Sequence, residues 1–461
     1  LDKVTYNGIP GMPTVDGGAI ERFKDGFVAV TGDGQFYELS WSASDGNLAA
    51  TKLPLSSPLV GRDAFFVNQS NTGLQFRVTD LLIRQSGQDY QVFVAHQVWD
   101  QANDCFLLGL SRSTLPKTID SGAKPVGAWT KIYETHPCIK QPFDTVETGG
   151  RLAWLGSEAI LMTVGDHGSD GRAEPPLSQM PDADYGKVLV IDLQGGARVL
   201  TSGHRNPQGL FVDNVGQTWL TEHGPAGGDE INRLVEGQNY GWPSVTYGTD
   251  YYKLTWPLNP DARDHANFTE PTFAFVPSIA ISNLIQLGGR QFPRWEDDFL
   301  VGSLRMETLY RLRMRENRVL FVEPILLGNR IRDLVEASDG RIIVWSDDES
   351  VSVLSRHIGP SSGEDIFQQC RACHAPVGNA KAIAPDLRGI VQRKVASSPD
   401  FSYSPALQAV GGTWTEERLL EFLKNPQKFA PGTAMISNGV SDEADRAALI
   451  DYLKRYGTES R

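Results

Sequence analysis

The sequence predicts an all-β domain of the propeller or sandwich class over residues 1–355, followed by a linker (356–363) and a small all-α domain (364–461). Three observations lead to this prediction. Short apolar runs recur between turn residues, one segment is rich in Gly, Pro and Ser, and the chain closes on a helical apolar pattern. A chain of 461 residues has room for two or three domains.

The β-domain is predicted from short runs rich in Val, Ile, Leu, Phe and Tyr, which alternate with Gly, Asp and Asn turns. The clearest runs are residues 26–30, 91–95, 159–164, 187–191, 217–220 and 341–345. Many short, evenly spaced strands are typical of a propeller or a sandwich. At four strands and roughly 40–60 residues per blade, this length would hold about six to eight blades. No repeated dipeptide marks each blade, so the pattern alone leaves the choice between these folds open.

The last part of the chain has a helical pattern. Residues 442–456 carry apolar side chains on one face of a predicted amphipathic helix. The apolar positions are Ala447, Ala448, Leu449, Ile450, Tyr452 and Leu453.

The segment Cys370-Arg371-Ala372-Cys373-His374 is the attachment signature of c-type haem. On one helical turn the two thiols reach both vinyl groups of a porphyrin, and His374 points its imidazole at the iron. A redox dithiol or half a zinc site are the alternatives. A zinc site needs further ligands nearby, whereas the next cysteine back is Cys138.

The residues after this motif resemble the class I cytochromes c. The matching segments are 384–389, 393–394, 401–403, 414–417 and 425–435. The resemblance implies that Met435 is the second axial iron ligand and that the Pro385 carbonyl orients His374. It also implies that Arg393, Tyr403 and Trp414 hydrogen-bond the haem propionates. A thioether opposite an imidazole raises the potential and suits electron transfer. The alternative for Met435 is a core methionine.

The net charge is distributed unevenly between the two predicted domains. The net charge is −13, while residues 362–461 carry twelve basic and twelve acidic side chains and are therefore neutral. An acidic first domain argues against nucleic acid and anionic membranes as partners. No apolar run reaches the roughly 18 residues of a membrane span. The chain begins at Leu1, and we expect a mature, exported form in the bacterial periplasm or outside the cell. There Cys105 and Cys138 are expected to form a disulfide, with free buried thiols as the alternative.

Three clusters in the first domain carry a second resemblance. They are 203–210, 222–232 with 239–243, and 329–333. Together they resemble the soluble pyrroloquinoline quinone (PQQ) glucose dehydrogenases and the related aldose and sorbosone dehydrogenases. The resemblance runs from about residue 147 to 345. It implies a six-bladed propeller that oxidises sugars.

The resemblance also implies a cofactor site. PQQ is a planar tricarboxylate, and its site needs fixed cations, each of which can clamp a carboxylate with two parallel hydrogen bonds. Asn206 and Gln208 would add directional donors, and the Gly224 and Pro225 carbonyls would hold a calcium ion. The arginines implied are Arg205, Arg305, Arg330 and Arg332. For Arg330 and Arg332, the alternative is a solvated strand edge.

Three positions depart from the family pattern. Glu147 stands where the dehydrogenases have a catalytic histidine, and a carboxylate can replace it as general base. Asp144 and His167 are further candidates for the base. Arg305 stands at a lysine position, which keeps the charge and changes the geometry. Phe275 stands where a tryptophan stacks on substrate, so the sugar specificity does not carry over.

Two functions are therefore expected. The first is a periplasmic quinohaemoprotein dehydrogenase that oxidises a sugar, another alcohol or an aldehyde. Its electrons pass to its own haem c and then to an external cytochrome or oxidase. The alternative is a calcium-stabilised binding module without PQQ that docks a partner onto an electron-transfer cytochrome. The replaced histidine favours the module. The arginine cluster argues against it, because like charges around one cavity are costly without an anionic ligand.

Overall fold

The structure is a computed structural model. It describes residues 1–461 except 8, 10–16, 43–46, 68–73, 118–126, 254, 257–264, 348–349, 357–361, 375–383, 400, 436, 438, 441 and 457–461. The chain divides into two compact units, residues 1–356 and 357–461. Most of the expected linker, residues 357–361, lies outside the described residues.

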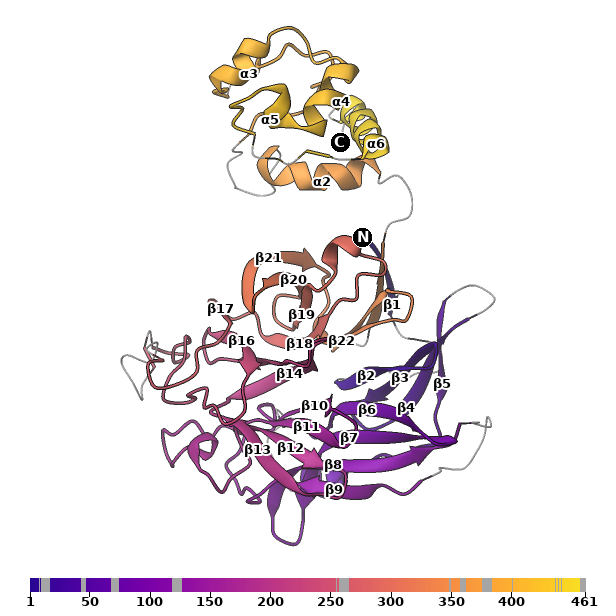
Figure 1. The fold of residues 1–461 in the computed structure, drawn as a ribbon, viewed down its shortest axis with the longest axis vertical. Helices are drawn as coiled ribbons and strands as arrows, with labels where there is room; N and C mark the ends of the chain where they lie inside the picture. Colours follow the sequence, from indigo (N-terminus) through magenta and orange to yellow (C-terminus); the bar gives the residue numbers. More distant parts are fainter. Residues whose placement is uncertain are drawn as a thin grey trace. The chain divides into compact units, whose positions relative to one another are not determined.

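The first unit is built from six four-stranded antiparallel sheets, so the predicted six-bladed propeller is confirmed (Figure 1). The first blade contains β2 (Gly18–Phe23), β3 (Gly26–Thr31), β4 (Phe36–Trp41) and β5 (Leu48–Lys52). The second contains β6 (Val78–Ser86), β7 (Asp89–Asp100), β8 (Cys105–Leu115) and β9 (Thr130–Glu134). The third contains β10 (Gly149–Leu155), β11 (Ala159–Val164), β12 (Lys187–Asp192) and β13 (Ala197–Ser202).

The remaining blades continue in chain order. The fourth contains β14 (Asn206–Val212), β15 (Thr218–His223), β16 (Asp229–Leu234) and β17 (Phe273–Phe275). The fifth contains β18 (Ile281–Gln286), β19 (Phe299–Ser303), β20 (Thr308–Arg315) and β21 (Arg318–Leu326). The sixth contains β22 (Ile331–Glu336), β23 (Ile342–Ser346), β24 (Ser350–Ser355) and β1 (Asp2–Asn7). The first strand of the chain thus pairs with the last and closes the ring.

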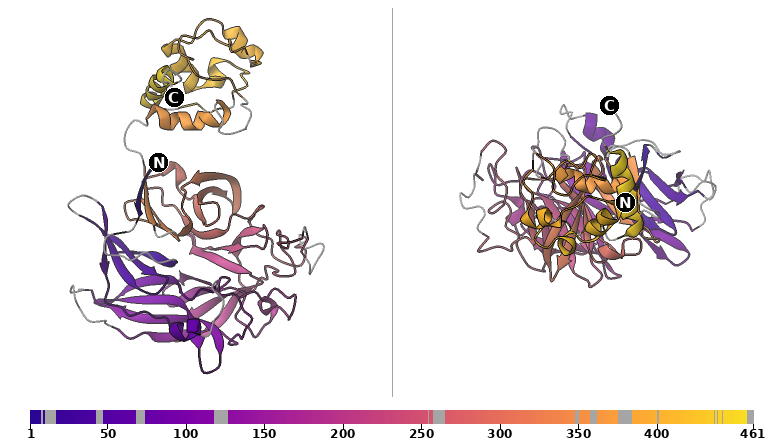
Figure 2. Two further views of the ribbon diagram at one scale, coloured as in Figure 1. Left: turned by 180° about the vertical axis from the view of Figure 1, so that it is seen from behind. Right: turned by 90° about the horizontal axis from the view of Figure 1, so that it is seen from above.

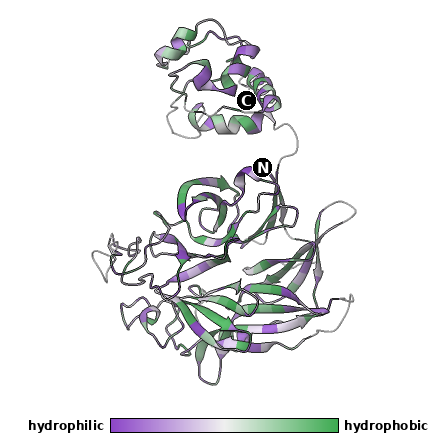
Figure 3. Cartoon of the chain, in the orientation of Figure 1, coloured by the Kyte–Doolittle hydropathy of each residue, from purple (hydrophilic) through white to green (hydrophobic). Residues whose placement is uncertain are grey.

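Apolar side chains from neighbouring blades form the core. Val28 and Val30 of β3 belong to one buried cluster with Val92 and Val94 of β7. β-Branched residues suit this position because they pack well on a pleated surface. Figure 3 shows green, apolar colouring along the strands. The helical elements of this unit are short: α1 (Arg62–Val67) and the 3₁₀ turns η1 (Leu177–Gln179) and η2 (Pro293–Trp295).

Cys105 and Cys138 form a disulfide, as predicted. Next to it, Phe106 and Ile139 exchange two backbone hydrogen bonds of 2.8 and 3.0 Å. The segment that leads from Cys138 to the third blade is thereby fixed to β8. Across the described part of the chain, no helix is long and apolar enough to cross a membrane.

The second unit is helical, as predicted (Figure 2). It contains α2 (Gly363–His374), α3 (Pro405–Val410), α4 (Glu416–Lys424), α5 (Pro426–Phe429) and α6 (Glu443–Arg455). The Asp442 side chain caps α6 by accepting from the Asp445 N–H. This confirms the helix predicted over residues 442–456, and it satisfies a backbone donor that the first turn leaves free.

Gly363 lets α2 cross α6 closely. A Cβ atom at this position would lie 2.0 Å from the Ala448 carbonyl oxygen and 2.5 Å from Cβ of Tyr452. Around the crossing, Phe367, Leu449 and Leu453 are almost completely buried. The first and last helices of this unit therefore meet with no space for a side chain.

Candidate functional site

A series of hydrogen bonds joins three of the predicted cofactor residues. Arg332, on β22, donates through Nη1 to Oε1 of Gln208 on β14, over 2.9 Å. Gln208 donates in turn to Oδ1 of Asn206, over 2.7 Å. Arg332 also clamps Asp347 with two hydrogen bonds of 2.9 and 2.6 Å. Burial opposes the charge on Asp347, yet Arg332 holds the pKa of this carboxyl below its usual value.

Arg330 adjoins this series, and Arg305 is its near neighbour through Leu304. The Arg330 guanidinium lies 3.8 Å from the Asp347 carboxylate and donates to the Leu304 carbonyl over 3.2 Å. Its side chain is 49% exposed, and Arg305, next to Leu304, is exposed as well. The structure therefore brings the first and third sequence clusters together, and Arg305 and Arg330 are the most accessible of the predicted cofactor arginines.

Arg205 lies at the other end of the series, directly before Asn206. Its Nη2 donates to the Glu147 carboxylate, and its Nη1 donates to the Gly224 carbonyl over 3.0 Å. The guanidinium lies 5.3 Å from the ring centre of Trp242. Among the described residues, the buried Arg205 Nε has no hydrogen-bond partner. The Nε–H of this buried cation is therefore an unsatisfied donor.

Glycine geometry sets the position of Glu147, just before β10. Gly149 and Gly150 both have positive φ, which other residues rarely adopt. A Cβ atom on Gly150 would lie 2.1 Å from Oγ1 of Thr79. The chain therefore turns into the innermost strand of the third blade with Glu147 beside Arg205.

Asp166 is a site residue that sequence reasoning missed. It is fully buried, and its carboxylate accepts from the Trp242 indole N–H over 2.6 Å. Burial and the nearby Glu147 raise the pKa of Asp166 well above its usual value, against the opposing charge of Arg205. Nothing in the composition of the segment 165–168 marks this burial.

The two further candidates for the general base, His167 and Asp144, lie next to each other, and His167 is buried. His167 is buried with φ of 54°, and its Nδ1 lies 2.7 Å from the Asp144 carbonyl oxygen. Burial lowers the pKa of His167 to about 4, so the ring is neutral near pH 7. Its Nε2 is buried and has no partner among the described residues, which removes it from solvent. The Asp144 carboxylate accepts from the Val146 backbone N–H over 2.6 Å.

Two buried carboxylates fix the loop that carries Gly224 and Pro225. Glu222 accepts from the Arg205 backbone N–H over 2.7 Å and lies 2.9 Å from Nδ1 of His204. Asp229 accepts from the Gly224 N–H over 3.2 Å and from two backbone groups near Ile281. These contacts hold the expected calcium loop from both ends.

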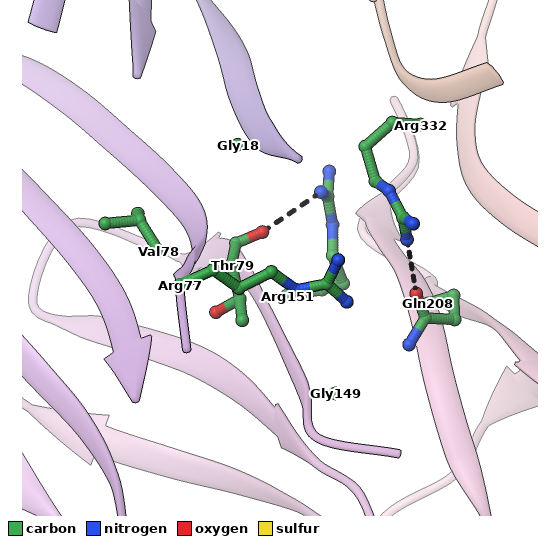
Figure 4. Close-up of a pocket in the computed structure, with 8 residues that line it drawn as sticks. All are labelled: Gly18, Arg77, Val78, Thr79, Gly149, Arg151, Gln208 and Arg332. Atoms are coloured by element: carbon green, nitrogen blue, oxygen red, sulfur yellow. Dashed lines mark hydrogen bonds between the residues drawn. The ribbon is translucent and has the colours of Figure 1, made fainter. Parts of the chain in front are cut away.

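A small pocket adjoins Arg332 and Gln208 (Figure 4). Its further lining includes Arg77, Arg151 and Thr79. Arg151 is buried and paired with Asp80 at 3.3 Å and Asp333 at 2.8 Å. Arg77 and Arg151 are not among the arginines that the family resemblance implies, and Arg77 precedes the stretch over which that resemblance runs.

Phe275 does not reach the site surface. It is 8% exposed and packs against Phe273 and Tyr310, with ring centres 4.9 and 5.4 Å away. The neighbouring Val276 is 62% exposed instead. The position at which a ring would be expected to stack on substrate is therefore part of the core.

The haem-attachment residues lie on α2. Cys370 is partly buried against the core of the second unit, and Cys373 is exposed. His374 Nδ1 lies 2.6 Å from the Pro385 carbonyl oxygen, which agrees with the predicted orienting contact. Burial lowers the pKa of His374, although this hydrogen bond opposes the shift. A neutral imidazole is the form that binds a metal.

The other predicted haem residues surround the same core. Met435 packs against it, and Gln427 Nε2 donates to the Met435 and Thr433 carbonyls over 3.2 and 2.8 Å. Trp414 is buried between Phe422 and Phe429. Arg393 donates to the Asp386 carbonyl over 2.8 Å, and the Tyr403 hydroxyl accepts from the Ser398 N–H over 3.3 Å. Iron ligation and propionate binding stay predictions.

Fold and site together define a six-bladed propeller with an arginine-lined site, in one chain with a helical domain that bears a haem-attachment motif. Residues 81–355, more than half of the chain, match the family described as glucose / sorbosone dehydrogenase. The chain belongs to this family. Residues 361–456 match cytochrome c, and this region is 44% identical over 103 residues to cytochrome c-554 of Methylosinus trichosporium. That match covers 22% of this chain and 78% of the relative, so the chain also contains a cytochrome c domain. The chain thus joins a propeller of the PQQ sugar dehydrogenase family to a cytochrome c domain.

Relatives of the propeller are more distant. Over 227 residues the chain is 31% identical to aldose sugar dehydrogenase YliI of Escherichia coli, covering 45% of this chain and 58% of that protein. It is 25% identical over 313 residues to quinoprotein glucose dehydrogenase B of Acinetobacter calcoaceticus, covering 51% and 64%. The chain thus spans less than two thirds of the length of these relatives.

Solved structures share the propeller fold. The apo form of the Escherichia coli aldose sugar dehydrogenase aligns with a TM-score of 0.60 at 22% identity, over 77% of this chain and 99% of that one. The PQQ-bound aldose sugar dehydrogenase of Streptomyces coelicolor aligns with a TM-score of 0.55 at 18% identity, over 76% and 97%.

Proposed function

We propose that the protein is a quinohaemoprotein dehydrogenase of the bacterial periplasm or cell exterior. It oxidises a sugar, or another alcohol or aldehyde, in the propeller. The electrons pass to haem c, bound to Cys370 and Cys373, and then to an external cytochrome or oxidase. The fusion keeps the haem at millimolar effective concentration, on the order of that reached by short flexible linkers.

The observation that carries the proposal is the free edge of Arg205. A buried guanidinium whose Nε lacks a partner among the described residues fits a carboxylate of PQQ. Next to Arg205 in the chain, Asn206 belongs to one hydrogen-bonded series with Gln208 and Arg332, which would offer further donors to the cofactor. Arg305 and Arg330, being accessible, would complete the charge needed for three carboxylates. The residues present therefore fit the cofactor.

The remaining roles follow from the same geometry. PQQ, when bound with calcium, supplies an electrophilic carbonyl that accepts a hydride from the substrate. Glu147 is the group we expect to remove the hydroxyl proton, since one of its oxygens accepts from Arg205 and the other accepts no hydrogen bond from a described residue. The Gly224 carbonyl has a second lone pair for calcium beside its bond to Arg205, and Pro225 would add a further oxygen.

One observation favours the rival binding module. The charges of Arg205 and Arg332 are already balanced by Glu147 and Asp347. The expectation that the arginine cluster is costly without an anionic ligand is therefore wrong for these two residues. PQQ is favoured by the unsatisfied Nε–H of Arg205 and by membership of the family, because the charges of Arg205 and Arg332 are already compensated.

The test is PQQ binding to the haem-loaded protein by equilibrium dialysis, with calcium and with a chelator. We expect about one calcium-dependent equivalent in the wild type and in Arg198→Gln, a control on the exposed edge strand β13. Binding should fall strongly in Arg205→Gln. An absence of binding in calcium would refute the dehydrogenase and leave the binding module.

A further inference from the structure

A buried glutamine links the second blade to the turn that carries Glu147. Gln97, on β7, is completely buried. Its side-chain oxygen accepts from the Arg77 backbone N–H over 2.8 Å. Its side-chain nitrogen donates to the Thr145 carbonyl over 2.8 Å and to Oγ1 of Thr148 over 2.7 Å. One amide therefore uses both of its donors and its acceptor on two segments that are far apart in the sequence.

The turn at residues 145–148 is fixed on both sides of Glu147. The Thr148 hydroxyl donates to the Thr145 carbonyl over 2.7 Å, which closes the turn on itself. Both threonines are buried. The backbone of the turn is thus held in the interior, while the Glu147 side chain reaches Arg205. The position of the Glu147 carboxylate therefore depends on how the turn is held.

Both segments that Gln97 joins also line the pocket beside Arg332 and Gln208. Arg77 comes from the second blade and Gly149 directly follows the turn, and both belong to the pocket lining (Figure 4). The Arg77 carbonyl also accepts from the Gln97 backbone N–H over 3.0 Å, so Gln97 holds this residue through both of its backbone polar groups. Gln97 therefore fixes two parts of the site relative to each other.

We propose that Gln97 is a positioning residue for proton transfer, holding the Glu147 carboxylate where it removes the proton of the substrate hydroxyl. The inference rests on the proposed function and adds to it a residue that touches neither substrate nor cofactor. Without the amide, buried polar groups of the turn lose their partners, and the turn must shift to satisfy them. A displacement of about 1 Å at a reacting group can lower a rate roughly 10²-fold.

The main test is Gln97→Met, which nearly keeps the length of the side chain and removes its hydrogen bonds. Haem reduction is measured on the full haem-loaded chain with PQQ and calcium, using the fastest of three probe substrates: D-glucose, D-glucitol and ethanol. We expect kcat to fall about 10- to 100-fold, with KM and bound PQQ within about twofold of the wild type. The control, Ser111→Ala, removes a buried 2.9 Å hydrogen bond to His96 in the same blade and should leave kcat within about twofold.

A double-mutant cycle separates positioning from a general loss of stability. Gln97→Met is combined with Glu147→Gln, and kcat is compared with that of each single variant. Because Gln97 acts through Glu147, its replacement should lower kcat by less than about twofold once Glu147 has lost its charge. An equal fold loss in both backgrounds would overturn the inference, since a merely structural effect does not depend on Glu147.

Hydrogen exchange followed by mass spectrometry tests the link without substrate or cofactor. Exchange in residues 143–149 should be faster in Gln97→Met and in Thr148→Val, a milder variant that removes the bridging hydroxyl, and unchanged in Ser111→Ala. Unchanged exchange in both turn variants would refute the role of Gln97 alone. A wild type that reduces no haem with all three probe substrates would instead refute the proposed dehydrogenase, and the catalytic role of the turn with it.

Discussion

Arg205 and Glu147 form an ion pair between the start of the fourth blade and the segment before the third. Their side chains are only 11% and 15% exposed, so the pair is shielded from solvent. The dehydrogenases that this chain resembles carry a catalytic histidine at this position. This chain carries Glu147, whose carboxylate neutralises Arg205, one of the arginines expected to bind PQQ. The replacement therefore affects both the expected base and the charge of the cofactor site.

Glu147→Gln removes the charge and nearly preserves the shape. We expect substrate-dependent haem reduction to fall by about 10²- to 10⁴-fold, the usual contribution of a general base, while haem content stays unchanged. Stopped-flow absorbance of the haem measures the rate, and dialysis confirms that PQQ still binds. Glu158→Gln, an exposed position after β10, is the control. Normal turnover of Glu147→Gln would show that another group takes the proton.

Glu21 makes the stability of the propeller depend on pH. Burial, Asp80 and Asp333 raise the pKa of Glu21 from 4.5 to about 8. The folded chain therefore keeps a proton that the unfolded chain releases, and stability falls as pH rises from 4.5 to 8. Glu21→Gln should remove part of this fall, so it stabilises at about pH 9 and changes little at about pH 4. Urea unfolding at several pH values measures the difference, with the exposed Glu316→Gln as control. The same pH slope in Glu21→Gln and wild type would contradict the assignment.

The disulfide stabilises the segment that leads to Glu147. Cys105 and Cys138 are separated by 33 residues, and a bridge over this distance contributes about 3–4 kcal/mol in the chain-entropy account. We expect the double variant Cys105→Ala/Cys138→Ala to lower the free energy of unfolding of the propeller by a similar amount. Denaturant titration of the variant and of the wild type, with and without reductant, measures it. A reductant effect on the variant itself would point to another cause.

Gly363→Ala should destabilise the haem domain. The added methyl group meets the Ala448 carbonyl at 2.0 Å, so α2 and α6 must separate. The expected cost is about 1–3 kcal/mol, the range for overpacked cores. Thermal unfolding followed at the haem absorbance measures it. Glu364→Ala, exposed on the same helix turn, should change stability by less than about 1 kcal/mol. Equal stability of both variants would mean that the helices separate without cost.

The strand pattern by itself indicates a propeller or a sandwich, and the family resemblance selects the propeller. The haem-attachment motif and the helix at 442–456 are encoded locally, whereas the Cys105–Cys138 pair is expected because these are the two cysteines outside the motif in an exported protein. Strand length and turn residues act over a few positions, and the spacing of Cys370, Cys373 and His374 is set by one helical turn. The family motifs also named Arg332, Gln208 and Asn206, which the structure joins in one hydrogen-bonded series.

Only the tertiary structure decided how these charges are balanced and which rings are accessible. Glu147 and Arg205 come from neighbouring blades, so their pairing depends on how the blades pack. Asp347 instead follows β23 and pairs with Arg332 on the adjacent strand β22 of the same blade. Burial of Asp166 and Phe275 likewise comes from packing between neighbouring blades. The local sequence pattern specifies whether a segment forms a strand or a turn. The neighbours of a side chain depend instead on contacts between segments that are far apart in the sequence.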